Sequence, residues 1–485
     1  MVTIIAGFMI PRIFIHELGS DVNGLLGTIT QIYSCVALVE AGIAAAAKTS
    51  LYKPIVENDI DGINRVLSVA SSYYIRITAI YYAIIFLLSV SMPFFINTNV
   101  DKFTIFLIAQ IEGISSAVSF LFCEKWIAFL SADGKQYVEE KLNFIARLST
   151  YFAKILIVYA GFSIIIVQLS SLIINIFKVV VYRIYIRRHY PWITLKYVPE
   201  SENVLSGKNY FAVSSIAWTF FTATDTILIS IMFSTSLASV YAVYNMISWN
   251  LSSFLERIYM SIVYVLGTSY NKGIEGYQII HDRFEYIFIS IITIFMTCSS
   301  ILSAAFMSIY IGNVQDANYI DKLLPVLLGG VQLISWYRYV SGNLATISGH
   351  VKESAQYSVV EAVINLSLSV FLGTFFGMYG IVIASVFALT YKLVKLTWLA
   401  NHHILKRTLS SSLKNYFCSI IVYLFFSIIF VVCPMKVESV LDFLFNGLCS
   451  CIIVVMAYLL ISFVLNRSVM KDIVSALKTK RLFLT

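Results

Sequence analysis

The stretch "FFTATDTILISIMF", residues 220–233, decides the fold class because it places one carboxylate inside an otherwise apolar run. The run continues back to about residue 208, and a helix that crosses hydrocarbon needs about 20 such residues. An ionised aspartate in hydrocarbon costs about 2.5 to 3.5 kcal/mol on insertion scales. Asp225 therefore faces the interior of a helix bundle, either as a functional carboxylate or as a protonated structural hydrogen-bond donor.

The composition extends this interpretation to the whole chain. Of its 485 residues, 59% are hydrophobic and only 12% are charged, and the mean hydropathy is +0.84. Soluble domains are about 25% charged. We predict an all-α polytopic membrane protein with about fourteen transmembrane helices, at residues 2–17, 24–46, 67–96, 103–130, 138–160, 162–186, 208–232, 238–266, 284–311, 323–348, 357–376, 379–400, 415–433 and 441–465.

Basic residues indicate which ends of these spans are cytoplasmic. If the connections alternate from a cytoplasmic N-terminus, twenty Lys and Arg residues lie in the cytoplasmic connections and the C-terminal tail. The outer connections hold only three, Lys102, Lys322 and Lys436. Because cytoplasmic loops carry the excess of Lys and Arg, both termini are predicted to be cytoplasmic.

The connection at 187–208 is one of the longest, and it separates the first twelve spans into two sets of six. This layout predicts two lobes followed by two extra helices. The predicted parts are an N-terminal lobe at 1–186, a cytoplasmic linker at 187–207, a C-terminal lobe at 208–400, two further spans within 401–466 and a basic cytoplasmic tail at 467–485.

Sequence motifs for catalysis are absent. The chain has no GxxxxGK[ST], HExxH or GxSxG motif, its seven cysteines form no CxxC pair, and its six histidines show no metal-ligand spacing. We therefore expect no enzymatic activity, no metal centre, no cofactor other than a coupling ion and no nucleic-acid partner. Transport would have to be driven by ion gradients.

Charged and aromatic residues inside the spans predict a cavity for an anion. Such residues generally face a bundle interior or water. A guanidinium group binds phosphate oxygens in bidentate fashion, and aromatic rings offer stacking faces to sugars. The alternative is that these residues form structural ion pairs and interhelical hydrogen bonds. The candidates are Arg12, Arg76, Arg147, Lys154, Arg257, Arg338, Trp249 and Trp336.

Five segments resemble a known family of bacterial transporters. They are "LVEAGIAAAAKTSLYKPIVENDIDGINRVLS" (38–68), "FLSADGKQYV" (129–138), "TDTILIS" (224–230), "SVYAVYNMI" (239–247) and "ISGHVKESAQYSVVEAVINLSLSVFLGTFFGMYGIVIAS" (347–385). The chain resembles the Wzx-type O-antigen and capsular polysaccharide flippases. These belong to the MOP superfamily, which also includes MATE exporters and the lipid II flippase.

The resemblance implies a fold, a function and a location. The implied fold is two six-helix lobes in a V around a central cavity, with two C-terminal helices appended. The implied function is movement of an undecaprenyl-pyrophosphate-linked oligosaccharide from the cytoplasmic to the outer leaflet of the bacterial inner membrane. The implied partners are this lipid-linked oligosaccharide, membrane lipids, and the polysaccharide polymerase and chain-length proteins. The protein itself is expected to be a monomer.

The resemblance also implies a cation site in the second lobe. Related flippases and MATE exporters build such a site from spans seven, eleven and twelve. The matching residues here are Asp225, Glu361 and Asn365, with an additional oxygen from Ser385. Oxygen ligands suit Na⁺, and the carboxylates suit a proton equally well.

Three other functions remain open from the sequence. A MATE-like exporter of small organic cations would need an acidic cavity, whereas the first half of this chain has a surplus of cations in its spans. A polysaccharide polymerase or ligase would carry a large outer loop, and none is predicted here. A lipid II flippase would share the fold and mechanism.

Overall fold

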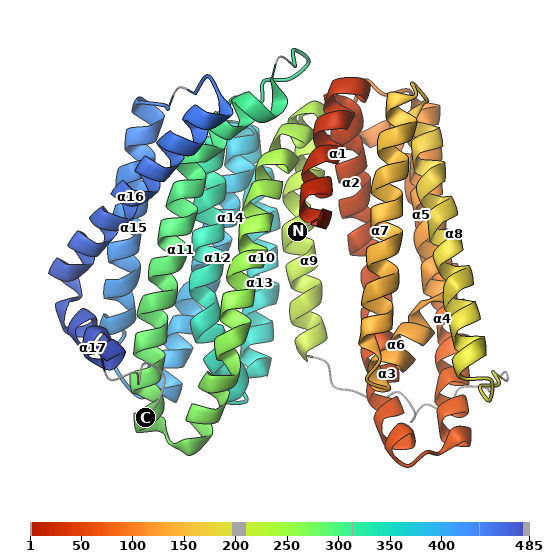
Figure 1. Cartoon of the computed structure of the whole chain (residues 1–485), viewed down its shortest axis with the longest axis horizontal. Helices are drawn as coiled ribbons and strands as arrows, with labels where there is room; N and C mark the ends of the chain where they lie inside the picture. Colours follow the sequence, from red (N-terminus) through yellow and green to blue (C-terminus); the bar gives the residue numbers. More distant parts are fainter. Residues whose placement is uncertain (1, 196–209, 313, 436, 479–485) are drawn as a thin grey trace. The chain divides into compact units, whose positions relative to one another are not determined.

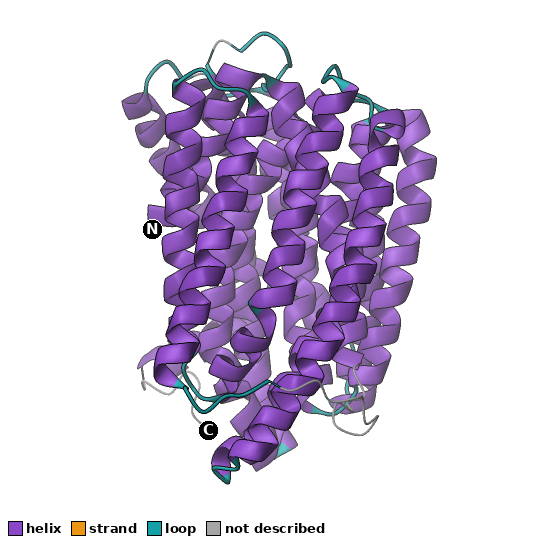
Figure 2. Cartoon of the chain, turned by 90° about the vertical axis from the view of Figure 1, so that its right-hand side faces the viewer, coloured by secondary structure: helices purple, strands orange, loops and turns teal. Residues whose placement is uncertain are grey.

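The computed structural model describes residues 2–195, 210–312, 314–435 and 437–478, and within these ranges it contains helices and loops but no strand (Figures 1 and 2). The helices are α1 (Val2–Leu18), α2 (Ser20–Val36), the 3₁₀-helix η1 (Ala37–Val39), α3 (Ala41–Val56), α4 (Ile60–Phe95), α5 (Lys102–Phe122), α6 (Glu124–Ala132), α7 (Gln136–Tyr159), α8 (Ile164–His189), α9 (Tyr210–Met232), α10 (Thr235–Lys272), α11 (Ile274–Ile311), α12 (Leu324–Ile347), α13 (Val351–Phe376), α14 (Met378–Trp398), the π-helix η2 (Leu399–Ile404), α15 (Ser410–Val432), α16 (Val440–Leu465) and α17 (Arg467–Lys478).

The all-α prediction is confirmed. Every predicted span coincides with helix in the described ranges, but two spans are interrupted. The span at 24–46 divides into α2, η1 and α3, and the span at 103–130 divides into α5 and α6 at Cys123. Eleven helices in the described part are long and apolar enough to cross a membrane. The predicted spans that miss this criterion are α1, which has only 17 residues, and α10 and α12, in which polar residues interrupt the apolar runs.

The chain divides into two compact units, Met1–Ser239 and Val240–Thr485. The first unit includes α9 and the first turn of α10, because α9 packs against α2. The division therefore falls C-terminal to the linker expected at 187–207, of which residues 196–207 lie outside the described ranges.

Two large apolar clusters dominate the described core of the first unit. One joins α1, α2, α4, α5, α7 and α8, and the other joins α3, α4, α6, α7 and α8. Aspartate side chains begin two of these helices: Asp59 accepts a hydrogen bond from the Gly62 amide at 2.9 Å, and Asp101 accepts one from the Thr104 amide at 3.1 Å. Such caps satisfy amide groups that have no partner within the helix.

At one end of the first unit, α2 lies very close to the start of α10. A Cβ atom on Gly24 would overlap the carbonyl group of Thr235, so only glycine fits this approach. Around it, Asp21 accepts hydrogen bonds from Thr235 at 2.5 Å, Ser236 at 2.8 Å and Asn99 at 2.8 Å. Polar bonds and close backbone packing together fix the first turn of α10 to α2.

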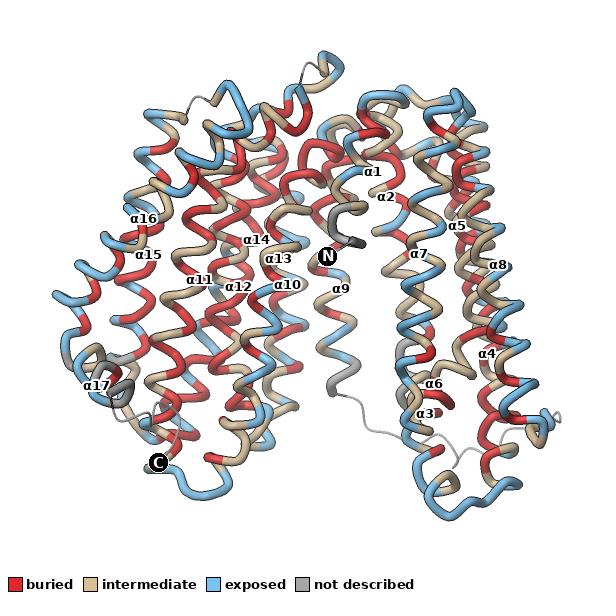
Figure 3. The backbone as a smooth tube through the Cα atoms, in the orientation of Figure 1, coloured by how far each residue is buried: buried red, intermediate tan, exposed pale blue. Residues whose placement is uncertain are grey.

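The core of the second unit is built on α11, α12 and α14, which carry long runs of buried residues (Figure 3). Its largest cluster also includes side chains of α10, η2 and α15, and a smaller cluster packs α16 against α11 and α15. The tight turn between α13 and α14 is made by Gly377, whose φ of 64° lies in the left-handed region. This turn sets α13 and α14 side by side.

Candidate substrate pocket and buried ion network

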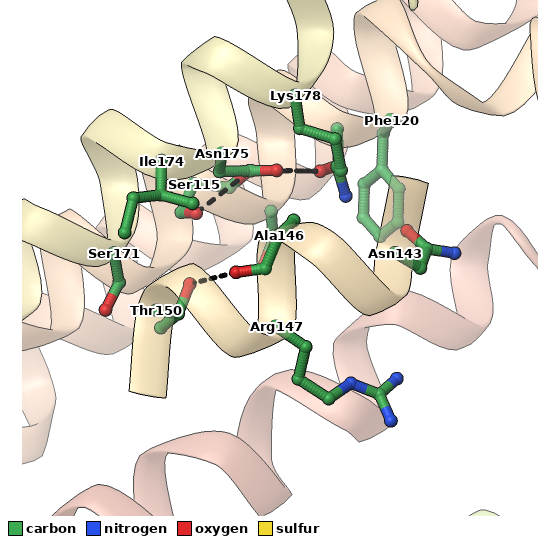
Figure 4. A pocket seen from close by; sticks show the side chains of 12 residues that line it. Ser115, Phe120, Asn143, Ala146, Arg147, Thr150, Ser171, Ile174, Asn175 and Lys178 are labelled. Atoms are coloured by element: carbon green, nitrogen blue, oxygen red, sulfur yellow. Dashed lines mark hydrogen bonds between the residues drawn. The ribbon is translucent and has the colours of Figure 1, made fainter. Parts of the chain in front are cut away.

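A polar pocket of about 470 Å³ lies among α5, α7 and α8 of the first unit (Figure 4). Arg147 of α7 and Lys178 of α8 contribute its cations. Arg147 is exposed and Lys178 is half-buried, so both are accessible to a ligand. The other described residues that line it are Ser115, Ser116, Ser119, Phe120, Asn143, Ala146, Thr150, Ser171, Ile174 and Asn175.

Hydrogen bonds to Asn175 hold one wall of this pocket in place. Its amide nitrogen donates to the Ser115 carbonyl at 2.7 Å and lies 3.0 Å from the hydroxyls of Ser115 and Ser119. In Figure 4 the Asn175 side chain points across from α8 toward α5. The wall therefore presents fixed hydroxyl and amide groups, which can donate to or accept from a sugar or a phosphate.

The charge of the pocket is positive. Among the described residues that line it there are two cations and no carboxylate. Glu124 and Glu139 interact electrostatically with Lys178 but are not part of the lining. Such an arrangement attracts an anion and repels an organic cation.

The other cations predicted in the first unit do not line this pocket. Arg12 and Arg76 are exposed on α1 and α4. Lys154 lies four residues after the pocket residue Thr150 on α7. It is attracted by Glu112, which accepts a hydrogen bond from Thr30 at 2.8 Å. Of the predicted anion-binding residues in this unit, the structure therefore places Arg147 alone in the pocket.

In the second unit, the predicted aromatic residues have different environments. Trp249 and Arg257 are exposed on α10. Trp336 is buried, its Nε1 donates to Ser252 at 3.0 Å, and its ring stacks on Tyr339 with centroids 4.5 Å apart. Trp336 is thus committed to packing, while Trp249 is available at the surface.

Arg338 and Glu361 lie together in a buried ion triad. The Arg338 guanidinium donates to Glu361 Oε1 at 2.6 Å, and the Lys392 ammonium donates to Glu361 Oε2 at 2.8 Å. The three side chains come from α12, α13 and α14 and are 7%, 1% and 10% exposed. Both oxygens of Glu361 are therefore occupied by cations that belong to the protein, and the triad carries a net positive charge.

The remaining residues of the predicted cation site are divided between the units. Asn365 and Ser385 are fully buried, and the Asn365 amide donates to the Ser385 hydroxyl at 2.8 Å. They adjoin Glu361, because Asn365 lies one turn along α13. Asp225 is buried on α9, in the first unit.

Sequence reasoning missed three features of the polar interior. Lys178 and Lys392 are not among the predicted site residues, although each is a cation inside a predicted span. The third feature is a group on α11, His281, Asp282 and Glu285, whose ligand-type atoms lie within 4.8 Å of one another. In the sequence, His281 and Asp282 are adjacent and Glu285 follows three residues later, but this spacing matches no standard metal motif.

Comparisons with known proteins identify the fold. No protein-family model and no curated protein sequence matches the chain. A solved structure of the lipid II flippase MurJ, in an inward closed conformation, matches with a TM-score of 0.71 and 14% identity over 97% of this chain and 98% of that chain. An inward-facing multidrug resistance MATE family transporter of the MOP superfamily matches with a TM-score of 0.65 and 12% identity over 83% of this chain and 95% of that chain.

The chain has the fold of these membrane transporters. It is a multi-pass, all-α membrane protein, and both similar structures are of a flippase or a transporter rather than an enzyme. Identities of 12 to 14% establish this fold without identifying the substrate.

Proposed function

We propose that the protein is a flippase that moves an undecaprenyl-pyrophosphate-linked oligosaccharide from the cytoplasmic to the outer leaflet of a bacterial inner membrane, for polysaccharide biosynthesis. The observation that carries this proposal is the pocket among α5, α7 and α8, whose described lining combines two cations with hydroxyl and amide groups and includes no carboxylate. The transporter fold provides the setting for such a movement.

The pocket chemistry suits a pyrophosphate joined to a sugar. The Arg147 guanidinium can hold two phosphate oxygens at once, and the Lys178 ammonium adds a compact charge. Ser115, Ser119 and Asn175 offer neutral hydrogen-bonding groups to sugar hydroxyls. The same set of groups has no anion with which to bind an organic cation, which argues against a MATE-like exporter of cations.

Substitution of Arg147 tests the proposal. Arg147→Ala should stop polymer export while the protein remains in the membrane, and Arg147→Lys should restore it only in part because an ammonium lacks the guanidinium fork. Lys141→Ala is the matched control, since Lys141 is exposed on the same helix and does not line the pocket. Normal polymer export by Arg147→Ala would contradict the proposal.

The similarity to MurJ makes lipid II a second candidate substrate. The two candidates can be separated in cells that lack their own lipid II flippase and in cells that lack their own polysaccharide flippase. Rescue of polysaccharide export alone supports the proposal, whereas rescue of cell-wall synthesis assigns lipid II.

We also propose that flipping is coupled to a cation gradient. Each charge that crosses 100 mV is worth about 2.3 kcal/mol, so outward movement of an anion is favoured in an inside-negative cell and a cation can reset the carrier. Asp225 is the candidate carboxylate, since both oxygens of Glu361 already bind Arg338 and Lys392. Asp225→Asn should abolish gradient-dependent flipping in proteoliposomes; full flipping with an unchanged response to Na⁺ and pH gradients would make Asp225 structural.

A further inference from the structure

A second cluster of ionisable side chains lies in the second unit, near the start of α11. It contains His281, Asp282 and Glu285 of α11 together with Arg407, which follows the π-helix η2. The transport mechanism proposed above uses none of these residues. Because α11 has 38 residues and is about 57 Å long, it exceeds the hydrocarbon core, and the loop cations place this end on the cytoplasmic side.

Asp282 and Arg407 neutralise each other. Arg407 Nη1 donates to Asp282 Oδ2 at 2.7 Å, and Arg407 Nη2 lies 2.7 Å from Asp282 Oδ1. The third guanidinium position, Nε, donates to Asn401 Oδ1 at 2.8 Å. The guanidinium is therefore held on both of its edges, and the pair contributes no net charge to the cluster.

Glu285 interacts electrostatically with His281 and Arg407 but forms an ion pair with neither in the described part of the chain. It is fully buried and accepts hydrogen bonds from three neutral groups on α15, Ser412 at 2.9 Å, Asn415 at 3.4 Å and the Tyr416 hydroxyl at 3.3 Å. No ion pair to Glu285 occurs among the described residues. Three donors favour the ionised carboxylate, but a buried charge without a partner is costly.

His281 is the neighbour that can supply the missing charge. It is fully buried, its Nδ1 lies 3.3 Å from Asp282 Oδ1, and within the described part of the chain its Nε2 has no hydrogen-bond partner. With Nδ1–H donating to Asp282, Nε2 carries a free lone pair. Histidine is the side chain that most readily changes its charge between pH 5 and 8.

The net charge of the cluster favours a proton over a metal ion as its ligand. With an ionised Glu285 and a neutral imidazole, the four groups carry a net charge of minus one, and a single bound proton brings them to zero. A divalent metal ion would bring them to plus one, and Arg407 already occupies both oxygens of Asp282. Sodium would balance the charge but prefers oxygen ligands to an imidazole nitrogen.

We propose that His281 is a proton-binding site of the second unit, with its imidazolium balanced by Glu285. The proton binds Nε2 while Nδ1–H stays on Asp282, and no other reactant is needed. The titratable and charged groups that face this site are Tyr277, Asp282 and Glu285 of α11, Arg407 after η2, and Tyr416 of α15. The site is independent of the transported lipid, so it can be tested apart from the proposed function.

The test is a proton titration of a protein in which His281 is the sole histidine. His16, His189, His350, His402 and His403 are exposed or half-buried, and replacing each with Gln leaves the cluster intact. In nanodiscs, the imidazole NMR signals of His281 should move between pH 8 and 5. Adding Glu285→Gln should leave His281 unprotonated over this range, because the balancing charge is gone.

Several results would overturn the proposal. They are imidazole signals that stay constant between pH 8 and 5, a Glu285→Gln variant that titrates like its parent, or signals that respond at pH 8 to micromolar Zn²⁺ or to Na⁺ instead of to protons. If Glu285→Gln does not fold, Ser412→Ala is the substitute. It weakens the ionised carboxylate by one hydrogen bond and should shift the titration in the same direction by a smaller amount.

Discussion

At the residue scale, the Arg338–Glu361–Lys392 triad is the feature with the largest expected energetic effect. One carboxylate binds two cations, and all three groups are nearly inaccessible to solvent. Removing the carboxylate would leave two buried cations without a balancing negative charge, whereas removing the lysine would leave a balanced pair. A buried charge that loses its partner typically costs about 3 to 5 kcal/mol.

We predict that Glu361→Gln lowers the free energy of unfolding by about 3 to 5 kcal/mol. Lys392→Met should change it little, because Arg338 and Glu361 remain paired. Thermal unfolding of the purified protein in detergent measures both effects. Lys395→Met, on an exposed position of the same helix, is the control. Equal losses for Glu361→Gln and Lys392→Met would show that the triad does not act as one charge-balanced group.

Part of the candidate pocket and of the buried ion triad could be predicted from the sequence. Arg147 could be predicted as a site residue because a cation inside an apolar span is costly unless it faces the bundle interior or water. The structure places it in the pocket. The pairing of Glu361 with Lys392 could not be predicted, because it depends on the register between α13 and α14 set by the turn at Gly377. Lys178 joins Arg147 only through packing of α7 on α8, and the sequence does not encode that contact in any readable pattern.

At the element scale, an ion pair joins α17 to α11 among the described residues. Ile473 is buried, and Arg283 donates to Asp472 through Nε at 2.7 Å and Nη2 at 3.0 Å. The guanidinium beside Asp472 holds the pKa of that carboxyl below its usual value. Because the pKa is lowered in the docked helix, the bond stabilises docking above the usual carboxyl range and is lost as the pH falls through the lowered pKa.

We predict that Asp472→Asn loosens α17 at neutral pH, and that acid has the same effect on the native protein. Asp472 is half-exposed, so the loss should be about 0.2 to 1 kcal/mol, or up to about fivefold faster amide exchange over residues 469–473. Hydrogen exchange read by mass spectrometry measures it. Asp442→Asn, in the first turn of α16, is the control and should leave α17 unchanged. Equal exchange in Asp472→Asn and native protein would show that the ion pair does not hold the helix.

At the scale of the whole molecule, the distribution of loop cations predicts which helix ends face the cytoplasm. Cys433, at the end of α15, is exposed and adjoins an outer loop in this prediction. Lys272, at the end of α10, is exposed and adjoins a cytoplasmic loop. These two positions therefore report on opposite sides of the membrane.

We predict that a membrane-impermeant maleimide labels native Cys433 from outside the inner membrane. Lys272→Cys, in a Cys433→Ser background, should label only after the inner membrane is permeabilised. Gel-shift labelling of spheroplasts measures both. Labelling of Lys272→Cys in intact spheroplasts would reverse or break the predicted topology.

The helical architecture could be predicted from hydropathy because every span needs a long apolar run. Hydropathy did not predict the break between α5 and α6 at Cys123, because Glu124 and Lys125 stand alone between two apolar stretches that together have the length of one span. Hydropathy also could not predict that the chain divides into two units after Ser239. This division depends on hydrogen bonds between Asp21 and the first turn of α10.

Gly24 has a consequence for sequence divergence. Wherever a descendant of this chain keeps the approach of α2 to Thr235, this position must stay glycine. A Cβ atom on Gly27 of the same helix would meet no described neighbour within 4 Å, so that position can change. We predict that Gly24→Ala impairs folding and Gly27→Ala does not, as measured by the yield of monodisperse protein. This chain is only 14% identical to a protein of the same fold, so few positions can guide a sequence alignment. A glycine that is required by a close backbone contact is such a position. Relatives that keep this close approach should therefore keep the glycine, and its replacement in a relative would indicate that the two helices lie farther apart there.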